Sequence, residues 1–93
     1  MRTLTFDIET YINYTLFALR DCDTKELTTF EIRGAKNTLS EKKIKKLRKL
    51  LTTNKIITYN GIKFDEPITA YALLGKTAKQ IFVKVQEIIV DGV

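Results

Sequence analysis

Residues 3–9, which read Thr-Leu-Thr-Phe-Asp-Ile-Glu, decide the fold because apolar and polar side chains alternate along them without interruption. Such alternation predicts a β-strand, in which successive side chains point to opposite faces of a sheet. The leucine, phenylalanine and isoleucine then face a core, while Asp7 and Glu9 stand together on the other face. The first strand therefore presents two neighbouring carboxylates.

This acidic pair has no obvious cationic neighbour in the sequence. Like charges held this close raise each other's pKa unless a positive charge lies between them. Mg²⁺ commonly takes one or two protein carboxylates together with water and phosphate oxygens. Asp7 and Glu9 thus indicate phosphate chemistry, and the alternative is that both are solvent-facing residues of an edge strand.

Two further strands follow. Residues 14–21 are rich in aromatic and aliphatic side chains, and residues 27–33 alternate again. The segment between them, Asp21-Cys22-Asp23-Thr24-Lys25, carries side chains that favour turns. We therefore expect an antiparallel hairpin here, and with the first strand a three-strand antiparallel meander.

A basic amphipathic helix is expected from residue 39 to about residue 52. The sequence Thr38-Leu39-Ser40-Glu41 fits a capping box in which Thr38 and Glu41 satisfy each other's backbone amides. The apolar residues that recur at helical spacing are Ile44, Leu47, Leu50 and Leu51. A loop over residues 34–37 precedes the helix.

Residues 56–59 form a short apolar run that predicts a fourth strand, parallel to the first because a helical crossover precedes it. Open sheets of this kind bind ligands beyond the carboxyl ends of their parallel strands. The acidic pair and the loop that starts at Asn60 would meet there. Asn60 is equally well explained as a turn residue before Gly61.

Two helices complete the expected order. Pro67 suits the first turn of the first, with Asp65 or Glu66 ahead of it at the positive helix end, and Gly75 ends it. Thr77 is the expected cap of the last helix. The apolar set of that helix is Ala78, Ile81, Phe82, Val85, Ile88 and Ile89. Residues 88–90 are also compatible with an extended segment.

Two of these stretches resemble motifs of a known family. Residues 6–10, Phe-Asp-Ile-Glu-Thr, are similar to the first motif of the DEDD-type 3′-to-5′ exonucleases of the ribonuclease H-like superfold. Asn60-x-x-x-Phe64-Asp65 is similar to their second motif, and the flanking Tyr59 and Pro67 resemble polymerase-associated and bacteriophage members. The resemblance extends over essentially all 93 residues.

The resemblance implies an α/β, ribonuclease H-like fold and hydrolysis of phosphodiester bonds at single-stranded DNA or RNA 3′ ends with two Mg²⁺ or Mn²⁺ ions. It makes Asp7, Glu9 and Asp65 the catalytic metal ligands. By the same analogy Asp7 bridges both ions, Glu9 holds the ion on the nucleophile side and Asp65 binds the second through water. Thr10 and Phe64, with Asn60, are the expected nucleic-acid contacts of the two motifs.

Other roles for the aromatic residues stay open. Phe6 and Phe64 stand in apolar, alternating contexts that favour packing in the core. Tyr11, Tyr14 and Tyr59 are near the motifs and are able to stack on a terminal base, or to pack on the surface.

The family's third motif, a Tyr-x-x-x-Asp or His-x-x-x-x-Asp on a later helix, is absent from this sequence. We therefore expect residues 1–93 to be a single domain that corresponds to the front part of such an exonuclease. The fourth carboxylate then lies in a longer chain or in a second polypeptide, such as a polymerase partner. The alternative function is a binding module for nucleic acid or protein that keeps the fold without cutting, and a weaker one is a purely structural subunit.

The net charge of +5 is concentrated between positions 42 and 49. A cationic patch attracts polyanions by counterion release. The helix lysines expected to meet phosphates are Lys42, Lys45, Lys46 and Lys49. The alternative is a solvated helix face in a lysine-rich protein.

Composition excludes several classes of protein. With 44% hydrophobic and 29% charged residues, the chain has the composition of a globular domain rather than a disordered one. It has no histidine, which excludes an imidazole base, and its single Cys22 excludes an intrachain disulfide and a cysteine-based zinc site. No apolar run approaches the roughly 20 residues that cross a bilayer. We expect a cytoplasmic protein with no membrane partner, in the host cell if the source is viral.

Overall fold

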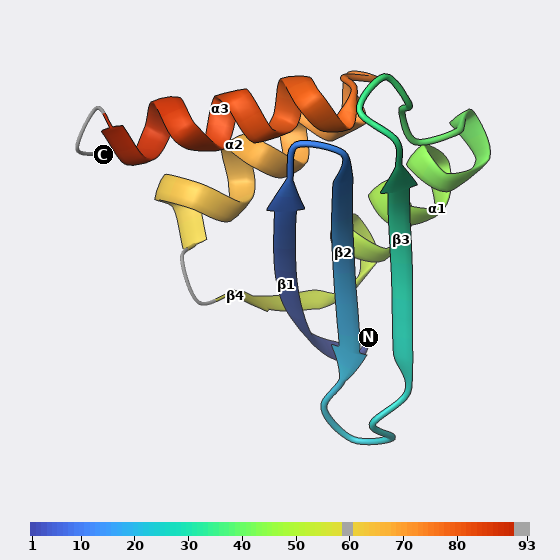
Figure 1. Ribbon diagram of the computed structural model, residues 1–93. Helices are drawn as coiled ribbons and strands as arrows, with labels where there is room; N and C mark the ends of the chain where they lie inside the picture. The colour runs from blue at the N-terminus through green and yellow to red at the C-terminus, as the bar shows by residue number, and fades with distance from the viewer. Residues whose placement is uncertain (59–60, 91–93) are drawn as a thin grey trace.

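The structure, a computed structural model, describes residues 1–58 and 61–90, with side chains described for residues 1–58 and 67–88. It contains four strands and three helices in this part of the chain (Figure 1). In chain order they are β1 (Thr3–Tyr11), β2 (Tyr14–Asp21), β3 (Leu27–Arg33), α1 (Glu41–Thr53), β4 (Lys55–Thr58), α2 (Gly61–Leu73) and α3 (Ala78–Val90). Among the described residues, none of the helices is long and apolar enough to cross a membrane.

The strands form one mixed sheet in the order β3-β2-β1-β4. β1 runs antiparallel to β2, to which only residues 12 and 13 connect it, and β2 runs antiparallel to β3. β4 runs parallel to β1, as α1 provides the crossover that a parallel pair needs. The predicted fold class, a meander followed by a basic helix, a parallel fourth strand and two helices, is confirmed.

All three helices cover the same face of the sheet. The buried strand residues share one face in the strand register, and Leu47 of α1, Ile68 of α2 and Ile81 of α3 lie in the same core cluster with them. In Figure 1 the helices α1 and α2 are seen behind β1, β2 and β3. The opposite face of the sheet is left open among the described residues, an arrangement that antiparallel sheets tolerate.

The start of α1 differs from the expected capping box. Ser40, not Thr38, is the N-cap, and its hydroxyl accepts a hydrogen bond from the backbone N–H of Lys43 at 3.3 Å. The preceding segment is tied down elsewhere, because the carbonyl of Asn37 accepts from the amide of Ala78 at 3.0 Å and Leu39 is buried. The helix therefore begins only after Leu39 has entered the core.

The start of α2 also differs. This helix begins at Gly61, so Pro67 lies inside it rather than in its first turn, and the prediction that Asp65 or Glu66 precedes the helix is wrong. Proline inside a helix removes one backbone hydrogen bond. Ile68 and Ala72, which have no exposed surface, hold this segment against the core and offset that loss.

The predicted end of α2 at Gly75 and the predicted cap of α3 at Thr77 agree with the structure. Gly75 has a positive φ of 84° and follows the end of α2. Thr77 caps α3 in a reciprocal pair, since its hydroxyl accepts from the amide of Gln80 at 3.1 Å and its own amide donates to Oε1 of Gln80 at 2.9 Å. Residues 88–90 are helical rather than extended.

Asp21, at the end of β2, makes stability depend on pH. Its buried carboxylate accepts hydrogen bonds from the amides of Thr24 and Asp23, and Arg2 lies 3.4 Å away. These amide bonds, and then the arginine charge, hold the pKa of Asp21 below its usual value. A carboxylate with a lowered folded-state pKa stabilises the fold above its unfolded pKa and loses that effect as pH falls through the folded one.

We expect Asp21→Ala to lower the melting temperature at pH 7, with the difference from wild type shrinking as pH falls below about 3.9. Thermal unfolding followed by circular dichroism between pH 2 and pH 8 measures this. Asp23→Ala is the matched control, because the exposed side chain of Asp23 takes no part in the turn while its backbone amide is retained. A difference that stays constant across the pH range would contradict the expectation.

Candidate functional site

The predicted acidic pair lies on the open face of β1. Asp7 and Glu9 are exposed, whereas Leu4, Phe6 and Ile8 between and before them are buried, so the expected alternation is confirmed. One oxygen of Asp7 accepts a hydrogen bond from the amide of Ile8 at 3.0 Å. Within the described part of the chain neither carboxylate forms an ion pair.

This donor set fits a hard divalent cation. Two adjacent carboxylates supply anionic oxygens, which Mg²⁺ and Mn²⁺ prefer, and no lysine or arginine in the described residues neutralises them. Side chains at positions 7 and 9 project from the same face of one strand, about 6.7 Å apart along it. Asp7 and Glu9 can therefore act on one ligand.

The strand that precedes the second motif ends beside the residue before Asp7. Thr58, the last residue of β4, pairs with Phe6, which directly precedes Asp7, and α2 begins shortly afterwards at Gly61. Asp65 is thus carried by the first turns of the helix that follows β4 in the chain.

Three predicted site residues fall outside the described side chains. Asn60 lies outside the described residues, and the backbones of Phe64 and Asp65 are helical while their side chains lie outside the description. Among the side chains that are described, no three His, Cys, Asp or Glu residues gather in a group that would hold a metal ion. Coordination by Asp65 therefore stays a prediction.

A sequence profile of the RNase H superfamily matches residues 4–92. The chain belongs to the RNase H superfamily. Comparisons with curated proteins and with solved structures gave no match. Membership confirms the ribonuclease H-like fold and assigns the protein to a group of nuclease-type, nucleic-acid-related domains.

Two first-motif residues of this RNase H superfamily domain project from the face of the sheet opposite the acidic pair. Thr10, a predicted nucleic-acid contact, pairs with the buried Thr15 and shares the covered face with Ile8, opposite Asp7 and Glu9. Phe6 is 2% exposed and stacks on Phe17, with ring centroids 6.2 Å apart, so its role in the core is confirmed.

The lysines of α1 also lie away from the acidic pair. Leu47 is the buried residue of α1, and it joins the core on the covered face of the sheet. The exposed lysines predicted to meet phosphates, Lys42, Lys45, Lys46 and Lys49, belong to this helix. In the RNase H superfamily domain, the sheet therefore separates α1 from the face that carries Asp7 and Glu9.

A third acidic residue of the open face is already bonded to neighbouring side chains. Glu31 of β3 lies in the same cross-strand row as Glu9, with Leu16 between them. The Tyr14 hydroxyl donates to Oε2 of Glu31 at 2.6 Å, and the Arg33 guanidinium lies 3.0 Å from the same oxygen. The Tyr14 bond and then the arginine charge hold the pKa of Glu31 below its usual value, while the bond to Glu31 raises the pKa of Tyr14.

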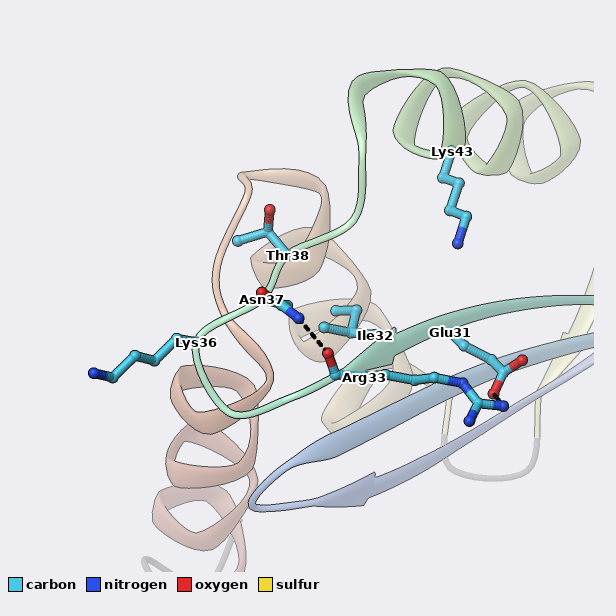
Figure 2. Close-up of a pocket in the computed structure, with 7 residues that line it drawn as sticks. All are labelled: Glu31, Ile32, Arg33, Lys36, Asn37, Thr38 and Lys43. Carbon is cyan, nitrogen blue, oxygen red and sulfur yellow. Dashed lines mark hydrogen bonds and ion pairs between the residues drawn. The ribbon is translucent and has the colours of Figure 1, made fainter.

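The structure also reveals a polar cleft of about 420 Å³ that sequence reasoning missed (Figure 2). Its lining residues are Glu31, Ile32, Arg33, Lys36, Asn37, Thr38 and Lys43. They come from the end of β3, the loop after it and the first turn of α1. Gly34 starts this loop with a φ of 100°, and a Cβ there would lie 2.9 Å from the side-chain nitrogen of Asn37. That glycine was the one sequence signal that pointed to a specially shaped loop.

Proposed function

We propose that this RNase H superfamily domain is a DEDD-type, metal-dependent 3′-to-5′ exonuclease, acting on single-stranded DNA or RNA ends. The observation that carries the proposal is the exposed pair Asp7 and Glu9 on the open face of β1, without an ion-pair partner among the described residues. In a chain of this superfamily, such a pair is well suited to hold ions beside a phosphodiester.

Asp7, Glu9 and Asp65 would hold the ions. Bound Mg²⁺ or Mn²⁺ supplies an activated water and stabilises the negative charge that develops on the phosphate and the leaving oxygen. The contribution of Asp7 and Glu9 is to present anionic oxygens at fixed positions, because their part of β1 is paired with β2 and lies directly after the stretch that is also paired with β4. Asp65 enters this set through its resemblance to the second motif, and it follows β4, whose last described residue, Thr58, pairs with Phe6 next to Asp7.

The test is cleavage of a linear, 5′-labelled, single-stranded oligonucleotide with Mg²⁺ or Mn²⁺. We expect products that shorten one nucleotide at a time from the 3′ end, and none in the presence of EDTA. A covalently closed circle of the same sequence is the matched control, since it offers no end. Cutting of the circle would contradict an exonuclease.

A second function is supported by a specific observation. Glu31 is a further acid of the open face, and its bonds to Tyr14 and Arg33 make it a poor additional metal ligand. A domain limited to Asp7, Glu9 and Asp65 would bind nucleic acid without cutting, unless a polymerase or another second chain supplied a fourth carboxylate. The same assay separates the two functions, because an oligonucleotide that is bound but stays intact with both ions identifies the binding module.

A further inference from the structure

A row of aromatic and cationic side chains crosses the open face beside the acidic pair. Tyr11 of β1 pairs with Tyr14 of β2, which pairs with Arg33 of β3. The two tyrosine rings have centroids 6.3 Å apart, and the Arg33 guanidinium lies 6.0 Å from the Tyr14 centroid. Tyr11 is 55% exposed. The row starts two residues from Glu9 and ends at the polar cleft.

The cleft at the end of this row is positively charged. Arg33, Lys36 and Lys43 line it, with Glu31 as the only acid among its lining residues. The carboxylate of Glu31 is paired with Arg33 and bonded to Tyr14, and the Lys43 charge also acts on it, so three cations share one acid. In Figure 2 the Lys43 side chain extends from α1 toward β3, whereas the Lys36 side chain extends from the loop away from the other lining residues. A polar hollow lined by Arg33 and Lys43, with Lys36 at its rim, suits phosphate oxygens.

The geometry points to this cleft as the site that binds the phosphates of single-stranded nucleic acid upstream of its 3′ end. We infer that the strand passes from the cleft over Tyr14 and Tyr11, whose rings stack on bases, to the acidic pair. The distance from β3 to β1 is two strand spacings, about 10 Å, which a short oligonucleotide spans. Aromatic rings next to a cationic groove are the usual means of holding single strands without sequence preference.

This inference rests on the proposed function, because it takes the 3′ end to lie at Asp7 and Glu9. It also replaces the α1 face as the phosphate site. The exposed lysines of α1 are separated from the acidic pair by the sheet, whereas Lys43, in the first turn of the helix, reaches the cleft.

The experiment measures binding of a 5′-fluorescein-labelled oligothymidylate by fluorescence anisotropy in EDTA, over a series of salt concentrations. For Lys36→Glu with Lys43→Glu we expect weaker binding and a salt-dependence slope reduced by roughly 0.7 for each phosphate that the protein no longer neutralises. For Tyr11→Ala we expect affinity to fall roughly five- to hundredfold, as loss of one stacked base would cause.

The matched control is Lys25→Glu with Lys55→Glu, which makes the same charge change. Lys25 lies in the turn at the other end of β3, and Lys55 is exposed on β4 at the opposite edge of the sheet. Lys36→Gln with Lys43→Gln serves as a milder pair, and far-ultraviolet circular dichroism checks that each variant is folded. We expect the control to keep the wild-type slope.

Three results would overturn the cleft as the phosphate site. The first is an equal reduction of the salt-dependence slope in the control, Lys25→Glu with Lys55→Glu. The second is a reduction seen only in a variant of α1, Lys45→Glu with Lys49→Glu. The third is a wild-type slope in both cleft variants. Because EDTA removes metal binding from the measurement, failure of the cleft is distinguishable from failure of the nuclease. A wild-type chain that binds no oligonucleotide at low salt overturns both, whereas cleft-dependent binding without Mn²⁺-dependent cutting contradicts the exonuclease alone.

Discussion

Mn²⁺ should raise the melting temperature of the wild-type domain by more than about 10 °C, and Asp7→Asn should abolish that rise. A ligand at a hundredfold excess over its Kd stabilises a folded protein by about 2.7 kcal/mol. For a domain of this size each kcal/mol corresponds to about 4–8 °C. Asn keeps the shape of the Asp7 side chain and removes the charge that attracts the ion. Thermal unfolding with and without Mn²⁺ measures the effect.

Without Mn²⁺ the same variant should be at least as stable as wild type. Asp7 and Glu9 repel each other on one face of β1, and neither has an ion-pair partner among the described residues, so removal of one charge relieves repulsion. Glu26→Gln is the matched control, since Glu26 is an exposed acid in the turn far from the pair. A Mn²⁺ rise that survives in Asp7→Asn, or disappears in Glu26→Gln, would rule out the proposed metal site.

Phe17→Ala should destabilise the domain by about 3–5 kcal/mol. Phe17 has no exposed surface and stacks on Phe6 within the core cluster of the described residues. A chain of 93 residues has a total stability of only about 5–14 kcal/mol, so the loss is a large share of it. Urea denaturation followed by circular dichroism measures the change.

The control for this substitution is Leu74→Ala, at a position where the side chain is 74% exposed. It removes a comparable amount of apolar volume and should change stability by less than about 0.5 kcal/mol. Similar losses in the two variants would show that the core is not where the structure places it.

The sheet was predictable because the alternation of apolar and polar residues within each segment indicates a strand and the face that it buries. The predicted bounds of β2 and β3 match the structure, β1 extends two residues beyond the predicted residues 3–9, and the parallel pairing of β4 followed from the crossover helix. The exposure of Asp7 and Glu9 followed from the same alternation. These features depend on neighbours in sequence, and the structure confirms them.

The errors lie where tertiary contacts outweigh local preference. The expected capping box at Thr38 was wrong because Asn37 is held by α3 and Leu39 by the core, so that Ser40 becomes the N-cap and the helix begins at Glu41. Pro67 favoured a helix start in its own neighbourhood, but α2 begins at Gly61, and the buried Ile68 holds the segment around the proline against the core.

The polar cleft was missed for a related reason. Its cations come from a strand end, a loop and a helix, and no spacing in the sequence links Arg33 and Lys36 with Lys43. The sequence drew attention instead to the dense lysines of α1, whose position relative to the sheet depends on which face the helix covers.

In the described part of the chain the helices cover one face of the sheet and leave the other uncovered, which has a practical consequence for mutational analysis. Positions such as Thr5, Thr29 and Tyr11 project from the uncovered face, away from the packed interior. Single substitutions there leave the interior untouched, so a position-by-position mutational map of that surface would report ligand recognition with little interference from misfolding.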